Sequence, residues 1–464
     1  MRVLVKSEIR NRIPLAKNRF FRTLKDVKRI LTSGGALLMG SALASKFLGF
    51  LRDRFLVDFF SEGAKIDFVF AAFRIPDFFF FLLVGGTVAT LFLPRAADLK
   101  GRDRMQFFSS FFWGVVILFG LLCGLGALFP EFFVSIFVSG FEGGARIEIA
   151  ELAQLLFGSV FLLAVSAVFS SSMQLRERFL SVAIAPILYT GTIAAGIYFF
   201  APEYGLPAVG YAAIAGASLH LFTNVIAFFA IGNRIGWYWK KPHKSWERFG
   251  GDFSARLATS AAFQISQSAD VWIASFLMVG TVGAFSIGAN WGHVMLSIVG
   301  LPLANAAFPK FSKQKNNFPA QKKILIDTLK WILLATIPTA IIGTVFASDI
   351  LRILFDLSGV MLHNTALVFA WIIASLPLAC TIPVLARVFF ANDDVRTPMK
   401  IWVISLSIGT ATAAILALRI LPPESAILGL ALGTFVTNTL SAVLFGIATW
   451  QKYFHPSSCN IPSQ

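Results

Sequence analysis

The chain has 464 residues, of which 56% are hydrophobic and only 14% are charged, and its mean hydropathy is +0.74. Soluble domains carry about a quarter charged residues, so this composition excludes a water-soluble globule. The net charge of +16 does not indicate a nucleic-acid-binding protein, because the basic residues lie in alternate loops between apolar runs. Long apolar runs, rather than the short alternating segments of a β-barrel, predict an all-α polytopic membrane protein.

The N-terminal segment, residues 1–30, is polar and carries ten basic against two acidic residues. It lacks the short apolar core and the cleavage site of a signal peptide, so we expect a cytoplasmic arm near anionic lipid headgroups. A membrane span needs about 20 apolar residues, and twelve segments meet that length. The predicted spans are 31–51, 68–93, 107–129, 152–175, 180–201, 206–232, 257–279, 283–309, 324–347, 364–386, 399–419 and 426–450.

The distribution of basic residues predicts the orientation of these spans. If the N-terminus lies inside, the inside segments hold 31 of the 40 Lys and Arg residues, and the opposite loops hold six. Cytoplasmic loops are enriched in Lys and Arg. We therefore expect a multi-pass protein of the bacterial cytoplasmic (inner) membrane with both termini in the cytoplasm and residues 451–464 as a cytoplasmic tail.

A basic cytoplasmic linker, residues 233–256, divides the spans into two six-helix lobes, residues 31–232 and 257–450. Six helices per lobe mean that both lobes enter the membrane from the same side, so the two repeats are parallel. A weak internal sequence repeat supports this division. It pairs Gly63-Ala64 and Phe92-Leu93-Pro94-Arg95 with Gly280-Thr281 and Ala307-Phe308-Pro309-Lys310.

Ionisable residues inside a membrane are costly, about 2.5–3.5 kcal/mol each on insertion scales, and are therefore functional candidates. Lys46 lies too deep in its span to snorkel easily, which favours a place on a cavity. Two readings stay open elsewhere: a solvated helix end at the close of the first span, and a structural salt bridge across Pro76 in the second. The candidates in these two spans are Lys46, Arg52, Asp53, Asp67, Arg74 and Asp77.

The seventh span carries a polar stripe made of Gln264, Gln267 and Asp270, which recur every three residues. A carboxylate on such a stripe either binds a coupling cation, Na⁺ or H⁺, or forms a fixed pair with a lysine of a neighbouring helix. We favour the coupling role slightly.

The sequence contains no recognisable nucleotide-binding, metal-binding or nucleophile motif, and we expect no cofactor. Its three cysteines have no paired spacing. Clustered acids or histidines at the membrane surface would be needed for an enzyme acting on lipid-linked sugars. The acidic pair Asp393-Asp394 has no metal partners nearby in the sequence, so an enzyme is disfavoured.

Several motifs in chain order resemble the MurJ/MviN family of lipid II flippases, within the multidrug/oligosaccharidyl-lipid/polysaccharide exporter superfamily. The resemblance covers most of the chain. The motifs are Ala44-Ser-Lys-Phe-Leu-Gly-Phe-Leu-Arg-Asp53, Gly63-Ala64, Asp67, Ala72-Phe-Arg-Ile-Pro-Asp77, Phe92-Leu-Pro94, Asp270-Val-Trp-Ile-Ala-Ser-Phe-Leu277, Phe308-Pro-Lys-Phe-Ser312, Leu385-Ala-Arg-Val-Phe-Phe390 and Asp394-Val-Arg-Thr-Pro-Met-Lys400.

This resemblance implies two six-helix lobes around a central cavity that moves lipid II, the undecaprenyl-pyrophosphate-linked peptidoglycan precursor, to the outer leaflet by alternating access. Lys46, Arg52 and Arg74 are then expected to bind the pyrophosphate through charge-assisted hydrogen bonds. Asp53, Asp67 and Asp77 are expected to serve as cavity or gating acids, and Asp270 as a residue of cation coupling. Membrane potential is a further expected driving force. The expected partners are the lipid-linked precursor and membrane lipids, with the chain acting as a monomer.

The sequence departs from the family pattern at four positions. Phe80 and Phe81 stand where many members have arginines, Gly85 where they have a glutamate, and Asn290 where they have an arginine. Twelve spans are predicted rather than the usual fourteen. Three alternatives therefore stay open: a flippase for another polyprenyl-linked oligosaccharide, a cation-coupled exporter of small amphiphiles, and a scaffold whose cavity is inactive.

Overall fold

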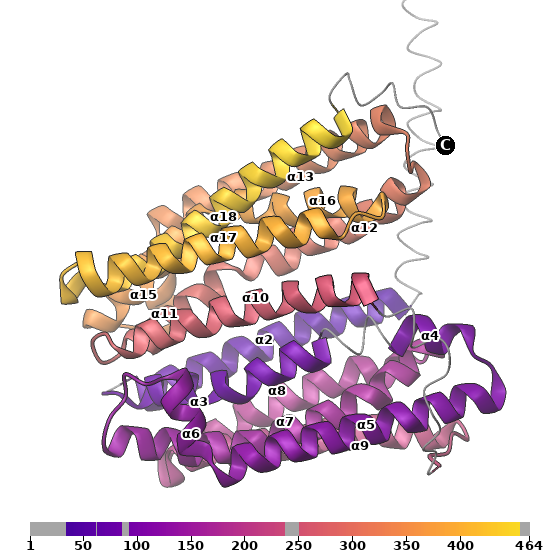
Figure 1. Cartoon of the computed structure of the whole chain (residues 1–464). Coiled ribbons are helices and arrows are strands. Elements are labelled where there is room, and N and C mark those ends of the chain that lie inside the picture. The colour runs from indigo at the N-terminus through magenta and orange to yellow at the C-terminus, as the bar shows by residue number, and fades with distance from the viewer. Residues whose placement is uncertain (1–33, 62, 86–91, 237–249, 455–464) are drawn as a thin grey trace, which may run out of the picture.

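The computed structural model describes residues 34–61, 63–85, 92–236 and 250–454. Within these residues the chain is almost entirely helical and contains no strand. The predicted arm and most of the predicted tail and linker lie outside the described residues. Two sets of helices lie one above the other (Figure 1), the first coloured indigo to magenta and the second salmon to yellow.

The first set, here called the N-lobe, contains eight helices within the described residues. A π-helical turn, Phe81–Gly85, follows the second of its long helices. The helices are α2 (Gly34–Phe60), α3 (Lys65–Phe80), α4 (Leu93–Asp98), α5 (Gly101–Leu128), α6 (Pro130–Phe137), α7 (Gly144–Leu175), α8 (Phe179–Tyr204) and α9 (Leu206–Ala230).

The second set, the C-lobe, contains nine helices in the part of the chain that the structure describes. They are α10 (Gly250–Ser275), α11 (Thr281–Gly292), α12 (Leu301–Lys313), α13 (Phe318–Val345), α14 (Ala347–Phe355), α15 (Gly359–Ala374), α16 (Leu376–Ala391), α17 (Arg396–Ile415) and α18 (Ile427–Thr449). Short π-helical segments, Leu296–Gly300, Leu416–Ile420 and Trp450–Phe454, and a 3₁₀ turn, Pro423–Ser425, complete the lobe.

Each of the twelve predicted spans corresponds to a helix or to a pair of consecutive helices, so the predicted fold class is confirmed. Eight described helical segments are long and apolar enough to span a membrane, and α15 with α16, bent by 45°, forms a ninth. The three predicted spans outside that set are α2, α3 and α10. α3 has only 16 residues because the π-helical turn Phe81–Gly85 follows it.

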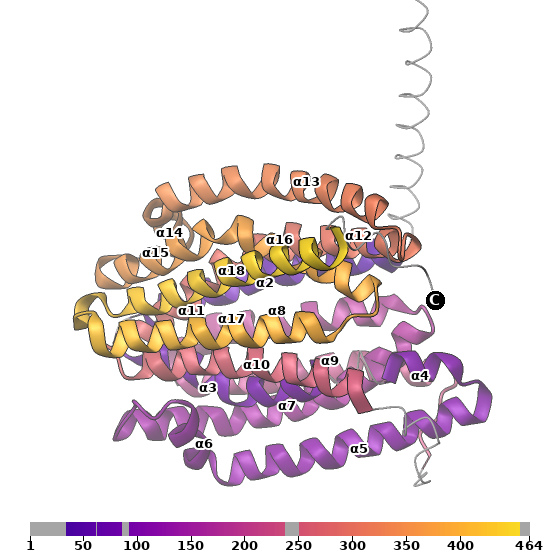
Figure 2. The ribbon, with the colours of Figure 1, turned by 45° about the horizontal axis from the view of Figure 1, so that its top comes forward.

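The two lobes repeat the same structural sequence. α3 and α11 each begin after a glycine with positive φ, Gly63 at 77° and Gly280 at 90°, a conformation that glycine adopts without steric cost. A π-helical turn then interrupts each of these spans. The third span of each lobe, α5 or α13, is followed by a short helix, α6 or α14 (Figure 2). The structure thus strengthens the repeat that the sequence only suggested.

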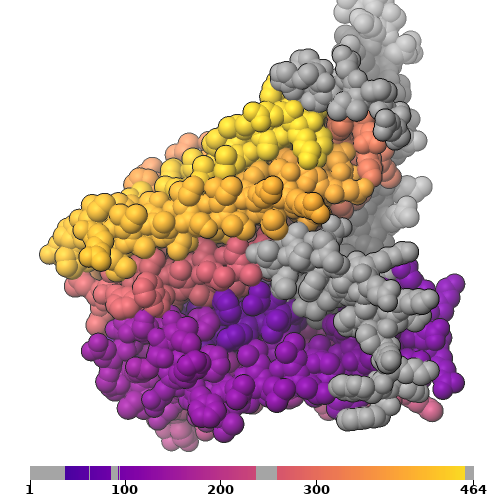
Figure 3. All heavy atoms as spheres, viewed as in Figure 1, coloured from indigo at the N-terminus to yellow at the C-terminus, as the bar shows by residue number. Residues whose placement is uncertain are grey.

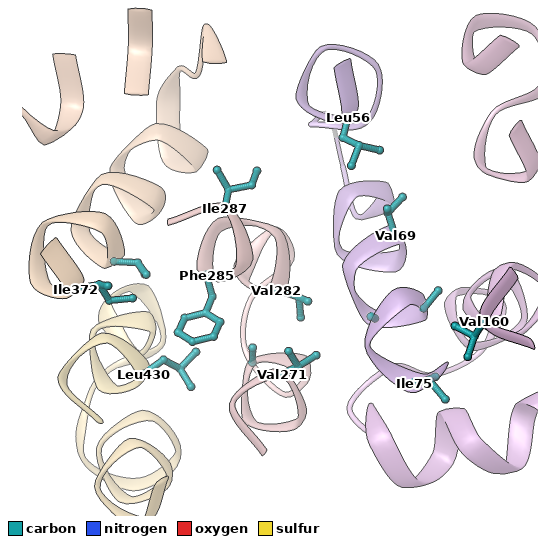
Figure 4. Packing of buried hydrophobic residues seen from close by; sticks show 14 of the residues in the cluster. Leu56, Val69, Ile75, Val160, Val271, Val282, Phe285, Ile287, Ile372 and Leu430 are labelled. Atoms are coloured by element: carbon teal, nitrogen blue, oxygen red, sulfur yellow. The ribbon is translucent and has the colours of Figure 1, made fainter. Parts of the chain in front are cut away.

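The last two helices of each lobe pack closely through small residues. A Cβ atom added to Gly196 of α8 would lie 2.3 Å from Cβ of Ala212 on α9, and one added to Gly433 of α18 would lie 2.5 Å from Cβ of Ala413 on α17. Small residues allow membrane helices to approach this closely. Figure 4 shows parts of both apolar cores, which hold each lobe as a packed unit.

The lobes meet at the end of the bundle where α2 and α10 end and α3 and α11 begin, here called the closed end. There α3 contacts α10 and α11, and α14 contacts α2. The two lobes are in direct contact at this end (Figure 3). Within the described residues, the hydrogen bonds between the lobes lie at the closed end or between it and the middle of the spans, so the bundle is joined asymmetrically along its length.

Candidate functional site: the inter-lobe cavity and the closed end

A cavity of about 540 Å³ lies between the lobes, bounded by α2 and α8 on one side and by α11 with the residues that follow it on the other. It contains two basic side chains, Lys46 and Arg52, and both are at least partly exposed to solvent. The other lining residues are Leu38, Ser41, Ala42, Ser45, Gly49, Asp53, Val182, Pro186, Thr190, Asn290, Trp291 and Val294. The cavity is therefore cationic and is lined by both lobes.

Arg52 and Asp53 form an ion pair inside α2, with Arg52 Nη2 and Asp53 Oδ1 separated by 2.6 Å. The second carboxylate oxygen of Asp53 accepts a hydrogen bond from Trp291 Nε1 of α11, at 3.1 Å. Asp53 is buried, whereas the side chain of Arg52 is 27% exposed. The prediction of a solvated helix end is wrong here, because α2 continues two turns further to Phe60 and buries Asp53 against the C-lobe.

Arg74 of α3 lies against the polar stripe of α10 rather than on the cavity lining. Its guanidinium donates to Gln264 Oε1 at 2.8 Å, to the Gln264 carbonyl at 3.0 Å, to Ser268 Oγ at 3.0 Å and to Gln267 Oε1 at 3.2 Å. The five N–H donors of an arginine fork suit such a dense set of acceptors. In this conformation Arg74 joins the lobes and is not available to a ligand in the cavity.

Asp67, near the start of α3, caps the first turn of α11 in the other lobe. Its two carboxylate oxygens accept hydrogen bonds from the backbone N–H groups of Gly280, at 2.6 Å, and Gly283, at 2.7 Å. These groups have no partner within their own helix. A carboxylate at a helix N-terminus also interacts favourably with the helix dipole. Asp67 is fully enclosed, so this contact seals the lobes together.

Asp77 and Asp270 both lie within electrostatic range of Arg74. Asp270 is partly buried on α10, and Asp77 is partly buried one turn after Arg74. On the α3 side Asp270 is thus in range of an arginine, whereas the sequence reading considered a lysine. The structure therefore brings one guanidinium and two carboxylates together at the seam between α3 and α10.

Further contacts close this end of the bundle. Gly140 N donates to Ser275 Oγ at 3.1 Å, and Trp272 Nε1 donates to Ser139 Oγ at 2.6 Å. A Cβ at Gly140 would lie 2.3 Å from the Ser275 backbone, so only glycine permits this approach. The loop between α6 and α7 is therefore packed directly on the end of α10.

The sequence identified the charged residues of the site but missed most of their partners. Trp291, Ser268 and the two N–H donors of α11 carry no sequence signal that links them to α2 or α3, since about 190 to 240 positions separate the partners. Of the two phenylalanines at family basic positions, Phe80 lines a separate cavity of about 400 Å³ inside the N-lobe, and Phe81 is 47% exposed. Within the described residues, no group of three or more His, Cys, Asp or Glu side chains is placed to hold a metal ion.

Two packed lobes, with a cationic cavity between them and contact concentrated at one end, define a polytopic membrane transporter. The sequence model of the family described as lipid II flippase MurJ matches residues 56–458. The chain therefore belongs to the MurJ family of lipid II flippases. A flippase moves a lipid between leaflets and catalyses no chemical reaction, so family membership also confirms the prediction of a transporter rather than an enzyme.

Individual relatives agree with this assignment. A probable lipid II flippase MurJ of Rhizobium tropici is 23% identical over 444 residues, which cover 92% of this chain and 81% of the relative. A solved lipid II flippase MurJ in an inward closed conformation has a TM-score of 0.77 and 20% identity, covering 89% of this chain and 87% of that one. An inward-facing multidrug resistance MATE family transporter has a TM-score of 0.69 and 12% identity, covering 89% and 96%. Both structures share the fold.

Proposed function

We propose that the chain moves lipid II from the inner to the outer leaflet of the cytoplasmic membrane by alternating access. The observation that carries this proposal is the pair Lys46 and Arg52 on one cavity between lobes that are joined at one end. A pyrophosphate is the part of lipid II that such a site recognises, because phosphate oxygens form short, charge-assisted hydrogen bonds with ammonium and guanidinium groups. The cavity of about 540 Å³ suits the pyrophosphate and its first sugar rather than the whole lipid.

The two basic residues have different roles in this proposal. Arg52 is held in position by Asp53, which is itself held by Trp291 of the other lobe. Lys46 has no ion-pair partner among the described residues and is exposed. Binding of an anion at this pair therefore changes the local charge where α2 contacts α11. In this way headgroup binding is coupled to separation of the two lobes.

The orientation is part of the proposal. The loops at the closed end are poor in basic residues, whereas the opposite loops are rich in them, which supports a periplasmic closed end. In a variant without native cysteines, Glu142→Cys and Ser358→Cys are expected to react with an impermeant thiol reagent in intact cells, and Lys313→Cys is not. All three positions are exposed. Labelling of Lys313→Cys from outside would overturn the orientation.

Monomeric function is supported by a cavity that one chain lines from both of its lobes. Native mass spectrometry of the purified protein tests this and the substrate together. We expect the mass of one chain with one polyprenyl-pyrophosphate lipid. Lys46→Glu and Arg52→Glu should lower both lipid II binding and flipping in proteoliposomes at least tenfold, because each reversal places like charge against the pyrophosphate.

The matched control is Lys65→Glu, which reverses an exposed basic residue of the N-lobe that does not line the cavity. It should leave binding and flipping unchanged. Normal flipping by both cavity reversals would refute the cationic site. Asn290, a neutral residue on the cavity wall, favours a second candidate, the flipping of another polyprenyl-linked oligosaccharide, and the mass of the co-purified lipid separates the two.

We further propose that Asp270 couples this cycle to Na⁺ or H⁺ and to membrane potential. The support is its position at the seam, in range of Arg74, whose hydrogen bonds within the described residues go to Gln264, Gln267 and Ser268 rather than to Asp270. A cation bound there would compete with Arg74 for the carboxylate and so bias the contact between α3 and α10.

A further inference from the structure

A third cavity, of about 200 Å³, lies inside the N-lobe at the end opposite the closed end. It is formed where α5 begins and where α7 and α9 end. Three arginines line it, one from each of these helix ends: Arg104, Arg176 and Arg234. It shares no lining residue with the inter-lobe cavity and is separate from the proposed lipid II site.

The three arginines form no ion pair within the described residues. Asp103 and Glu177 are their sequence neighbours but do not line the cavity. Burial lowers the pKa of Arg176, and repulsion by the guanidinium of Arg104 lowers it further. Three positive charges on one cavity, with no carboxylate among its lining residues, make the cavity attractive to an anion.

Two neutral features of the cavity suit the same ligand. Asn233 lines it, and the Nδ2 donor of that side chain is buried without a hydrogen-bond partner in the described part of the chain. A buried donor without an acceptor is unfavourable, and an anionic oxygen would satisfy it. Arg104 is held by a bond from its Nε to the carbonyl of Leu99, at 2.6 Å, which leaves its terminal nitrogens for a ligand.

Apart from Ser172 and two glycines, the remaining wall is apolar and contains Phe92, Met105, Phe108, Leu175, Phe228 and Ile231. A soluble anion would gain nothing from such a wall, whereas the glycerol and first acyl carbons of a lipid would. Arg176 and Arg234 are exposed at the rim, at the depth where the helices leave the membrane. Basic pockets between membrane helices bind anionic lipid headgroups in this manner.

We propose that this cavity binds the phosphate group of an anionic phospholipid, with its arginines on the phosphate and its apolar wall on the acyl end. The bound lipid ties together the ends of α5, α7 and α9. In the proposed orientation that lipid belongs to the inner leaflet. The site itself depends only on the geometry of the N-lobe, so its failure and failure of the flippase proposal are distinguishable.

The test measures binding of short-chain phosphatidylglycerol to the full-length purified protein in detergent by native mass spectrometry, beside phosphatidylcholine and sn-glycerol 1-phosphate. We expect phosphatidylglycerol to bind at least tenfold more tightly than either of the others, with an affinity that falls as salt rises. The double variant Arg176→Gln/Arg234→Gln should lose this preference. Arg178→Gln, an exposed arginine of the same loop that does not line the cavity, should keep it.

Lipid II binding in the same samples reports whether the double variant is folded. If that variant does not fold, Arg176→Lys/Arg234→Lys replaces it, and its preference should be weakened because lysine lacks the bidentate fork. Equal binding of phosphatidylglycerol and phosphatidylcholine would overturn the anion site. Equal binding of glycerol phosphate would overturn the lipid assignment, and an unchanged preference in both double variants would overturn the residues.

Discussion

The first helical hairpin of each lobe, α2–α3 or α10–α11, has the same form but a different chemistry. The first hairpin carries charged side chains, among them Asp53, Asp67 and Arg74. The second meets them with neutral groups: the amide of Gln264, the N–H of Gly283 and the indole of Trp291. In these contacts the first hairpin supplies the charged members and the second supplies neutral ones, although α10 also carries the carboxyl group of Asp270.

This division explains how a sealed contact remains reversible. A hydrogen bond to a charged group contributes about 1.5–3 kcal/mol, so a few of them hold the closed end. Ion pairs between the lobes would be harder to separate, since leaving one buried charge without its partner costs about 3–5 kcal/mol. Here the C-lobe groups that bond to Asp53, Asp67 and Arg74 are neutral, so separation of these hydrogen bonds leaves no charged bonding partner on the C-lobe. Asp270 of α10, which is in range of Arg74 without an ion pair to it, is the carboxyl group that separation affects.

The largest effect is expected from removing Arg74, whose side chain joins the two hairpins through four hydrogen bonds. Arg74→Gln deletes all four hydrogen bonds to α10 and leaves Asp77 and Asp270 without their nearest cation. We expect the closed end to open, with the equilibrium shifted at least tenfold, and flipping to fall by at least the same factor. Spin labels at Glu142→Cys and Asp349→Cys, exposed on opposite lobes, report the separation.

Arg54→Gln is the matched control for that experiment. Arg54 also crosses between lobes, but its guanidinium is 3.5 Å from a carboxylate of Asp356 that is 79% exposed. Surface ion pairs contribute only about 0–1 kcal/mol, so the distance distribution should stay close to that of the unaltered protein. If Arg54→Gln and Arg74→Gln opened the closed end equally, positive charge at this end would hold the lobes together, and the hydrogen bonds from Arg74 to α10 would not.

Asp270→Asn tests the same difference in charge between the two hairpins, and its expected effect is smaller. The exchange gives α10 a wholly neutral stripe, while Arg74 keeps its four bonds to the same helix. Stability should therefore change by less than about 1 kcal/mol, because no buried cation loses its last partner. Flipping should become independent of the Na⁺ or H⁺ gradient, with headgroup binding retained. A melting temperature lowered by several degrees with unchanged ion dependence would assign Asp270 a structural role only.

The spans were predictable because a length of about 20 apolar residues is a property of the sequence alone. The short helices α6 and α14 were not predicted. Segments of eight or nine residues are too short to cross a membrane, so a search for spans by length does not detect them. The end of α2 was placed too early because Arg52, Asp53 and Arg54 interrupt its apolar run. Only the neighbouring helices, which supply Trp291 and Asp356, explain why the helix continues.

The sequence identified the charged residues of the site, because charges are unusual within membrane spans. It did not identify the contacts that these residues make. Lys46 and Arg52 were expected on a cavity and line one. Arg74 was also predicted to bind the pyrophosphate, but its side chain binds the polar stripe of α10. The sequence could not show this contact, because it depends on how the two lobes pack. Asp67 was predicted as a cavity or gating acid, and the structure shows it capping the start of α11 in the other lobe.

The most direct test of alternating access is to lock the closed end reversibly. In a variant without native cysteines, Ser139→Cys and Trp272→Cys place thiols on opposite lobes where the native side chains meet, within reach of a short, disulfide-containing thiol crosslinker. We predict that crosslinking abolishes lipid II flipping in proteoliposomes, leaves lipid II binding intact, and is fully reversed by reduction, while each single cysteine variant is unaffected. Flipping at the unlinked rate by the crosslinked protein would contradict the account, since lipid II would then cross without separation of the lobes.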